Sequence, residues 1–356
     1  MSGRSWCACA NTCLTERVKP HTPADNAAFI AGMPKAELHV HLEGTLERSQ
    51  RVEFAVRNSM PAPDADGADS FTDLTTFLAA YYPNMSVLQT EHDFFDLAYA
   101  YLAKAAGQGV RHAEMFFDPQ AHTTRGIEFS TVITGYHQAV VSAERDLGID
   151  ARLILCILRD LSVESAMQTL ESSLRFKHWI VGIGLDSDER DNPPSKFAGV
   201  FARARDEGYL ITMHCDVDQA NSIEHIRQAI EDIGVDRIDH GTNIVEDERL
   251  VALARDRGIG LTSCPLSNAV VSEGAKAHEI VALLRAGVKI TVNSDDPAYF
   301  GGYVTENLLS LAASTDLSRD ELVQLQRNAF EIAWISGVER DAHLDALESY
   351  AAEWVG

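Results

Sequence analysis

Eight short apolar runs that could form strands recur along the chain, and longer stretches of helical periodicity separate them. This alternation is typical of βα units and a parallel sheet. No linker rich in proline, glycine or serine interrupts the series, so we predict a single (β/α)8 TIM-type barrel rather than an open, doubly wound sheet. The runs are AELHVHLEG (36–44), VRHAEMFFD (110–118), ARLILCILRD (151–160), IVGIGLDSD (180–188), LITMHCDVD (210–218), RIDHGTN (237–243), IGLTSCP (259–265) and KITVNSDDP (289–297).

The segment between the first two runs is longer than one crossover helix requires. It contains FTDLTTFLAAYY (71–82) and HDFFDLAYAYLAKAA (92–106), whose apolar and aromatic residues recur at near-helical spacing. We therefore expect a helical insert after the first strand, packed as helix core or forming a lid over the barrel mouth. After the eighth run, residues 318–337 open with a capping-box pattern, Ser318 followed by Glu321, and predict a terminal helix with a structural role.

The first residues lack this pattern. We expect residues 1–30 to be a mobile N-terminal extension and residues 31–356 to form the barrel. The extension carries Cys7, Cys9 and Cys13 in a C-x-C-x3-C spacing. Because this spacing lacks the second ligand pair of a zinc ribbon, a structural metal site there is the less favoured interpretation.

Charge and hydropathy exclude several classes of function. The chain has 30 Lys+Arg against 53 Asp+Glu, a formal net charge of -23, so nucleic acid and anionic membranes would be repelled. No apolar run is long enough to cross a bilayer or to serve as a signal-peptide core, so we expect a cytoplasmic location.

Cys156, Cys215 and Cys264 lie in apolar runs and are expected to be buried, reduced thiols. The oligomeric state stays open.

Several unusual polar residues stand at the carboxyl ends of the predicted strands, where side chains of a barrel converge on one mouth. His39 and His41 are two residues apart on the first strand and can point at one metal ion. His214, His240 and Asp295 end the fifth, sixth and eighth strands. Imidazole and carboxylate ligands suit zinc, so the pattern predicts a hydrolytic divalent-metal centre in which some of the five residues act on water or substrate instead.

Four of these strand ends carry longer motifs, PKAELHVHLEGTLE (34–47), RIDHGTNIVED (237–247), LTSCPLSN (261–268) and VNSDDPAYFGGY (292–303). Together they resemble the adenosine/adenine deaminase family within the amidohydrolase superfamily, and the likeness covers nearly everything from Met33 onward. HLEGTLE stands where nucleoside deaminases typically have HLDGS, and this feature, with EMFFDPQAHTTRGI, GLDSDERDNPPSKF and DDPAYFGGY, resembles the adenine-deaminase branch. The resemblance implies hydrolysis of the exocyclic amine of adenine or a close 6-aminopurine, with adenosine as an alternative, to the 6-oxopurine and ammonia.

The resemblance also assigns roles at the metal centre. It implies that His39, His41, His214 and Asp295 hold one zinc ion, although similar ligand sets accept Fe(II) or Mn(II). It implies that Asp295 also helps to hold the attacking water, and that His240 helps to deprotonate this water and stabilises the developing oxyanion.

Neighbouring residues have less defined roles. The resemblance implies that Asp296 hydrogen-bonds the imidazole edge of the purine and that the backbone of Ser187 contacts the ring, unless Ser187 serves only the loop. Glu43 follows His41 by two and could contact the base, fill the space of a ribose, or be a solvated carboxylate at the rim. Ser267 and Asn268 are expected to shape the turn after the seventh strand.

His112 and His122, in or after the second strand, are expected to be surface or structural residues.

The fifth strand end departs from the family pattern, H-A-G-E, whose glutamate donates a proton to a ring nitrogen. The corresponding position here is Val217, which has no proton to donate. Asp216 and Asp218 flank it and share a face with His214 if the strand continues. We expect Asp216, which is closer to the strand end, to be the replacement acid, with Asp218 as the second choice. Aspartate is shorter by about 1.5 Å, so the pocket must differ.

Three functions remain open, in order of preference. The first is deamination of a 6-aminopurine, with an aspartate replacing the glutamate. The second is metal-dependent hydrolysis of another substrate class without ring protonation. The third is purine binding with weak catalysis, which has little need of a complete set of metal ligands.

Overall fold

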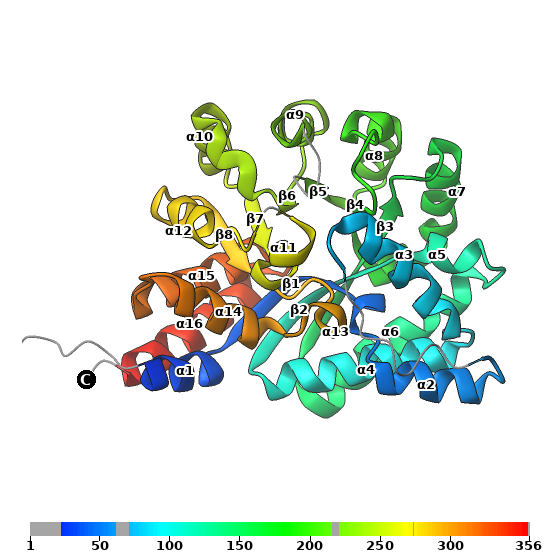
Figure 1. Ribbon diagram of the computed structural model, residues 1–356, viewed down its shortest axis with the longest axis horizontal. Coiled ribbons are helices and arrows are strands. Elements are labelled where there is room, and N and C mark those ends of the chain that lie inside the picture. The colour runs from blue at the N-terminus through cyan, green and yellow to red at the C-terminus, as the bar shows by residue number, and fades with distance from the viewer. Residues whose placement is uncertain (1–22, 62–70, 216–220, 273, 355–356) are drawn as a thin grey trace, which may run out of the picture.

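The computed structural model describes residues 23–61, 71–215, 221–272 and 274–354 of the 356-residue chain. Eight parallel strands lie next to one another in chain order, and helices surround them (Figure 1). The strands are β1 (Lys35–His41), β2 (Val110–Phe117), β3 (Asp150–Leu158), β4 (Ile180–Asp186), β5 (Leu210–Cys215), β6 (Arg237–His240), β7 (Gly260–Ser263) and β8 (Lys289–Val292).

The last strand returns to the first at the carboxyl end of the sheet. The backbone N–H of His41 donates to the carbonyl oxygen of Asp295 at 2.9 Å, and the N–H of Asp295 donates to the carbonyl oxygen of His39 at 3.0 Å. These bonds draw the residues after β8 against β1 and close the mouth of the barrel. The predicted (β/α)8 barrel is therefore confirmed.

The helices fall into those before β4 and those after it. The first group comprises α1 (Pro23–Gly32), η1 (Glu43–Thr45), α2 (Arg48–Arg57), α3 (Leu74–Asn84), η2 (Met85–Val87), α4 (Glu91–Gly107), α5 (Pro119–Thr123), α6 (Phe129–Leu147), α7 (Val163–Ser173) and η3 (Leu174–Trp179). The second comprises η4 (Pro194–Phe197), α8 (Ala198–Asp206), α9 (Ser222–Arg227), η5 (Gln228–Ile233), η6 (Thr242–Glu246), α10 (Glu248–Arg257), α11 (Pro265–Val271), α12 (Ala277–Arg285), α13 (Pro297–Phe300), α14 (Val304–Ser314), α15 (Arg319–Ile332) and α16 (Gly337–Glu353).

The predicted insert after the first strand is confirmed as helical, and it divides into two roles. Helix α4 begins at a capping box of Thr90 and Asp93 and buries one face against the core beside α6. Helix α3 begins at Asp73, whose side chain accepts from the backbone N–H of Thr76, and it lies over the barrel mouth. The two expectations for this insert, helix core and lid, therefore describe α4 and α3 respectively.

The helix predicted over residues 318–337 ends earlier than expected. Ser318 and Glu321 form the expected capping box at the start of α15. The helix ends at Ile332, and Ser336 caps a further helix, α16, by accepting from the backbone N–H of Glu339. The prediction overlooked the cap signal of Ser336 at the end of this range, where the next helix begins at Gly337.

The expected boundary of the N-terminal extension falls inside a packed helix. Helix α1 begins at Pro23 and buries Phe29 and Ile30, and it lies beside α16 (Figure 1). The hydroxyl of Tyr350 in α16 donates to the carbonyl oxygen of Phe29 at 2.8 Å. The part of residues 1–30 that the structure describes thus belongs to the folded body, because Phe29 packs against the rings of Tyr350 and Trp354. Cys7, Cys9 and Cys13 lie outside the described residues.

The end of the barrel opposite the mouth contains buried ion pairs. A guanidinium nitrogen of Arg237 donates to the carboxylate of Glu114 at 2.6 Å, and His112 lies between Glu114 and Asp150. His112 itself is fully buried, so the structural role expected for it is confirmed and a surface position is not.

Cys156, Cys215 and Cys264 are buried free thiols, as predicted. No helix in the described part of the chain combines the length and apolar character that a membrane span requires.

Candidate metal centre and cavity

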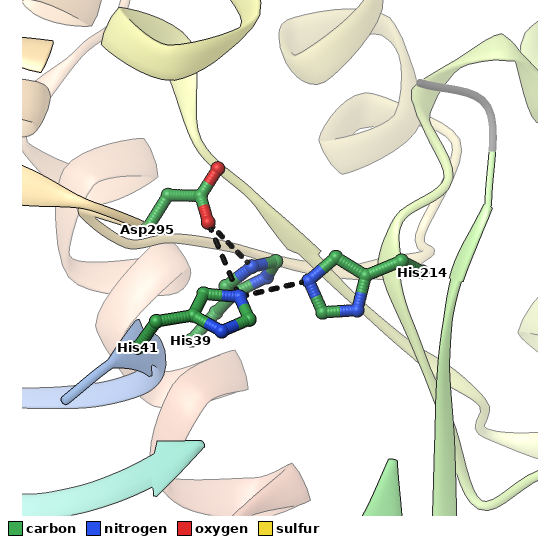
Figure 2. A group of neighbouring side chains, drawn as sticks. All are labelled: His39, His41, His214 and Asp295. Carbon is green, nitrogen blue, oxygen red and sulfur yellow. Dashed lines mark hydrogen bonds and ion pairs between the residues drawn. The ribbon is translucent and has the colours of Figure 1, made fainter. Parts of the chain in front are cut away.

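Four side chains from three parts of the barrel mouth converge on one point (Figure 2). Nε2 of His39 lies 3.1 Å from Oδ1 of Asp295, and Nε2 of His41 lies 3.5 Å from the same oxygen. Nε2 of His41 also lies 3.1 Å from Nε2 of His214. One donor atom of each residue lies within 4.8 Å of the others, and all four side chains are buried. The structure thus brings together the four residues predicted to hold a metal.

The far nitrogens of the imidazoles show how the rings are oriented. Nδ1 of His39 faces the carbonyl oxygen of Thr262 at 3.2 Å and its hydroxyl at 2.9 Å, and Nδ1 of His214 faces the carbonyl oxygen of Leu185 at 3.1 Å. A carbonyl oxygen only accepts, so each Nδ1 carries the proton and each Nε2 presents a lone pair to the cluster.

This donor set fits a bound cation. Burial lowers the pKa of His41 to about 4 and that of His214 well below its ordinary value, so both rings are neutral at pH 7. Burial alone would raise the pKa of Asp295, but the imidazoles of His39, His240 and His41 beside it lower it well below its usual range. Lone pairs that face one another across 3.1 Å repel unless a positive charge lies between them. Three imidazoles and a carboxylate are ligands that zinc and related divalent metals accept.

His240 lies beside the cluster at the end of β6 and has a backbone φ of +59°. Its Nδ1 lies 3.0 Å from Oδ1 of Asn268, which only accepts, so Nδ1 carries the proton and Nε2 is free to accept one. Nε2 lies 3.7 Å from Oδ2 of Asp295, and burial lowers the pKa of the ring. The hydroxyl of Ser267 donates to the same Asp295 oxygen at 2.5 Å.

Ser267 and Asn268 therefore do more than shape a turn. Both lie in α11, which directly follows β7, and both hold polar groups of the site in place. Their position after a strand end is the signal that could have identified them, because other polar residues at strand ends had already been assigned to the mouth.

Asp296 is buried next to the cluster, and its Oδ1 has no hydrogen-bond partner among the described residues. Gly44 packs against this carboxyl group. A Cβ atom at Gly44 would lie 2.0 Å from Oδ1 of Asp296 and 2.8 Å from its Cα, so the close approach requires glycine.

A cavity with an empty volume of about 470 Å³ opens onto these residues. Helix α3 covers part of it, and the hydroxyl of Tyr82 donates to the hydroxyl of Ser187 at 2.8 Å. Ser187 follows β4 with a φ of +72° and lines the cavity. The lining residues are His41, Leu74, Phe77, Leu78, Tyr81, Tyr82, Asp118, Asp186, Ser187, Glu189, His214, His240, Ser267, Val271, Asp295, Asp296 and Phe300.

Glu43 does not occupy the position that the sequence suggested. It is fully buried, and it is absent from the described residues that line the cavity. Its Oε1 accepts from Nε2 of His122 at 2.8 Å and from the hydroxyl of Tyr136 at 2.9 Å. Strand β1 ends at His41 and a 3₁₀ turn begins at Glu43, so strand alternation no longer sets the direction of this side chain. His122 is structural, as expected, and it is buried.

Asp118 and Asp186 form a pair of carboxyl groups in the cavity wall that the sequence analysis did not single out. Burial, together with the charges of Asp186 and Glu43, raises the pKa of Asp118 well above its ordinary value. Burial also raises the pKa of Asp186 to about 7. Oδ2 of Asp186 lies 3.5 Å from Nδ1 of His41, so Asp186 orients this imidazole from behind.

Arg159, directly after β3, is a further residue that sequence reasoning missed. It is fully buried, and its guanidinium donates to the backbone carbonyl of His214 at 2.7 Å and to that of Asn192 at 2.9 Å. One of its nitrogens lies 3.6 Å from the carboxylate of Glu189. Arg159 thus fixes the backbone at the end of β5 where His214 projects.

The two aspartates expected to replace the missing glutamate cannot be placed. Asp216, Val217 and Asp218 lie outside the described residues, and the described part of β5 ends at Cys215. Their roles stay predictions.

Comparison with known proteins agrees with this geometry. A family model described as "Adenosine deaminase" matches residues 34–350, which is nearly the whole chain. The match confirms the resemblance seen in the strand-end motifs.

Individual relatives agree over similar lengths. An uncharacterised deaminase of Schizosaccharomyces pombe is 50% identical over 93% of this chain and 99% of its own. The adenine deaminase of Chlorobium luteolum is 47% identical over 91% of this chain and 96% of its own. The crystal structure of adenine deaminase from Arthrobacter aurescens superposes with a TM-score of 0.86 at 39% identity, covering 90% of this chain and 99% of that one.

Proposed function

Because the chain belongs to the adenosine deaminase family and is one of its aminohydrolases, we propose that it hydrolyses adenine or a close 6-aminopurine to the 6-oxopurine and ammonia. The observation that carries the proposal is the buried group of three imidazoles and one carboxylate, with His240 beside it at the wall of a cavity. Two relatives that align over nine-tenths or more of this chain bear the name adenine deaminase, and this supports the free base as the substrate.

We propose that His39, His41, His214 and Asp295 hold one zinc ion. Zinc bound there would act as a Lewis acid and lower the pKa of water from 15.7 towards about 7. The outward Nδ1 protons of His39 and His214 support this assignment, since the hydrogen bonds that fix them leave each Nε2 unprotonated.

His240 is proposed as the base for the attacking water. Its Nδ1 is occupied by Asn268, so Nε2 accepts a proton from the water and passes it towards the leaving amine. Asp295 offers its Oδ2 to the same water, and the Ser267 hydroxyl keeps that oxygen in place. The water oxygen bonds to C6 of the purine, the C6–N bond breaks, and the amine leaves as ammonia.

The purine is proposed to lie between the end of β8 and the end of β4. The free Oδ1 of Asp296 would hydrogen-bond the imidazole edge of the ring, and the backbone of Ser187 would contact the ring from the other side. Glu43 is proposed as a positioning residue, because it lies behind the cavity wall and fixes the segment after β2.

Protonation of the ring nitrogen is proposed to fall to Asp216, with Asp218 as the second choice. Replacement of each by asparagine tests this role. A loss of about 100-fold in kcat for one variant, with bound metal retained, identifies the acid. If neither variant loses activity to that extent, an acid from this segment is ruled out.

A spectrophotometric deamination screen over adenine, adenosine and N6-alkyl adenines tests the proposal as a whole, together with metal analysis of the purified protein. We expect about one zinc per chain and turnover of adenine. Turnover of nucleosides without free bases would overturn the substrate, and a purified protein free of transition metal would overturn the hydrolytic mechanism. Turnover of a non-purine amide or amine alone would favour a metal-dependent hydrolase of another class.

A cytoplasmic location is part of the proposal. It is supported by the three buried free thiols.

A further inference from the structure

One buried carboxyl group of the cavity wall has no function in the chemistry described above. Asp118 follows β2 directly, is 1% exposed and lines the cavity. Its Oδ1 has no hydrogen-bond partner among the described residues. A buried carboxyl oxygen without a partner is costly, so such a group is expected to serve a ligand.

A chain of buried hydrogen bonds holds Asp118 in place. The backbone N–H of Asp118 donates to Oε1 of Glu43 at 3.4 Å, and that oxygen also accepts from His122 and Tyr136. Arg125 donates to Nδ1 of His122 at 2.8 Å. Because a guanidinium cannot accept, this bond fixes the proton of His122 on Nε2, where it is directed at Glu43. The segment that carries Asp118 is thereby preorganised.

Asp118 lies next to the metal centre without belonging to it. An oxygen of Asp118, an oxygen of Asp186 and a ring nitrogen of His41 lie within 4.8 Å of one another. Asp186 is already directed at Nδ1 of His41, and Nε2 of His41 is directed at the cluster. Asp118 shares a hydrogen bond with Asp186, and its Oδ1, which has no partner among the described residues, is the oxygen left to meet a substrate bound against these residues.

We propose that Asp118 selects free purine bases over nucleosides by accepting a hydrogen bond from the ring N–H at position 9. This inference rests on the proposed function and names its substrate class. Asp296 is assigned to the other nitrogen of the imidazole edge, so the N–H at position 9 is the donor that remains on that five-membered ring. A nucleoside carries a sugar carbon at position 9 and has no proton to donate. It would leave the buried carboxyl oxygen unpaired and would also need room beside it.

Steady-state kinetics with adenine and 9-methyladenine test the proposal, because the methyl group removes only the N–H. We expect wild-type protein to prefer adenine in kcat/KM by about 1,000-fold or more, as sites built to bond a substrate N–H reject analogues that lack it. Asp118→Ala is expected to lower kcat/KM for adenine by about 100-fold and to leave that for 9-methyladenine unchanged or higher. Asp118→Asn, which keeps the shape and one acceptor oxygen, is expected to lose only about 10-fold on adenine.

If Asp118 has a purely structural role, Asp118→Ala would lower kcat/KM for adenine and for 9-methyladenine by the same factor. That result would overturn the inference. Calorimetric binding of the products hypoxanthine and 9-methylhypoxanthine supplies a measurement that does not depend on turnover. The same preference for the unmethylated ring is expected in wild-type protein, and Asp118→Ala should abolish it. If Asp118→Ala does not fold, the Asp118→Asn variant is measured in its place.

Two further outcomes separate this inference from the proposed function. Wild-type protein that turns over adenine and 9-methyladenine equally well would overturn the inference alone, whereas protein that turns over no purine would overturn both. Metal analysis tests whether Asp118 and Asp186 bind a metal ion rather than the purine. A second metal ion per chain that disappears in Asp118→Ala would show that Asp118 and Asp186 bind a cation instead of the base.

Discussion

Nε2 of His41 lies 3.1 Å from Nε2 of His214, and neither ring is positively charged at neutral pH. Two neutral imidazoles in this arrangement direct lone pairs at each other, and Asp295 adds a carboxylate oxygen 3.5 Å from the first of them. This repulsion is relieved by a cation. The metal is therefore expected to contribute to the stability of the fold as well as to the chemistry.

Removal of the metal with a chelator is expected to abolish deamination and to lower the melting temperature. One equivalent of zinc should restore both. A metal present at 100 times its dissociation constant adds about 2.7 kcal/mol to the free energy of unfolding, which differential scanning calorimetry can measure. His214→Asn should lose the bound metal, while His278→Asn, at an exposed position in α12, should retain it. Equal metal content in the two variants would contradict the assignment.

Substitution of Gly44 tests the packing against Asp296. A Cβ atom at this position would lie 2.0 Å from Oδ1 of Asp296 and must displace the carboxyl group or the backbone. We expect Gly44→Ala to lower kcat/KM by about 100-fold, because catalysis is sensitive to displacements of about 1 Å, and to retain the metal. The matched control is Gly199→Ala in α8, where a Cβ meets nothing within 4 Å. A Gly44→Ala enzyme as active as this control would show that Asp296 does not need its observed position.

Arg159 is expected to stabilise the metal centre through the backbone. It donates to the carbonyl oxygen of His214 at 2.7 Å from a fully buried position. Arg159→Met leaves two backbone carbonyls without this donor, so we expect the free energy of unfolding to fall by about 2–4 kcal/mol in urea titrations. Zinc affinity should fall by about 10–100-fold, as for other residues that orient a ligand. Arg203→Met, at an exposed position of α8, provides the control and should change neither quantity.

Much of the site could be predicted from the sequence because regular strands fix side-chain direction. His39 and His41 share a face by strand alternation, and His214 and His240 end strands whose apolar runs were recognised. Parallel strands of one barrel bring these ends together, so the clustering of these side chains at the mouth followed from strand order, whereas the choice of four as proposed metal ligands came from the family resemblance.

The other residues of the site could not be predicted, because their roles depend on the turns that follow the strands and on contacts between distant parts of the chain. Glu43 follows the spacing of the two ligands of β1, yet a 3₁₀ turn directs it into the core. Asp118, Asp186 and Arg159 also stand at strand ends, but carboxylates and arginines at such positions have many uses. Only the three-dimensional contacts show that Oδ2 of Asp186 faces His41, whereas Oδ1 of Asp118 has no hydrogen-bond partner among the described residues.

The stability of the fold should also depend on pH through a lysine remote from the metal. Nζ of Lys35 is buried and donates to the carbonyl oxygens of Met33 at 2.9 Å and Gln108 at 2.8 Å. Burial, assisted by the charge of Arg111, lowers the pKa of Lys35 to about 8. Between this value and its ordinary pKa near 10.4, the unfolded chain binds more protons than the folded one. The contribution of Lys35 to stability is therefore least favourable below pH 8 and rises as the pH increases to about 10.4.

Urea unfolding of wild-type protein and Lys35→Met at pH 7, 8, 9 and 10 measures this dependence. The pair isolates one group, since all other titrations are common to both proteins. The difference in the free energy of unfolding, wild type minus variant, should grow with pH by up to about 3 kcal/mol, because one pKa unit corresponds to about 1.4 kcal/mol. A difference that stays constant over this range would mean that Lys35 keeps its ordinary pKa in the folded protein. A difference that falls would mean that its carbonyl partners stabilise the charged form more than burial opposes it.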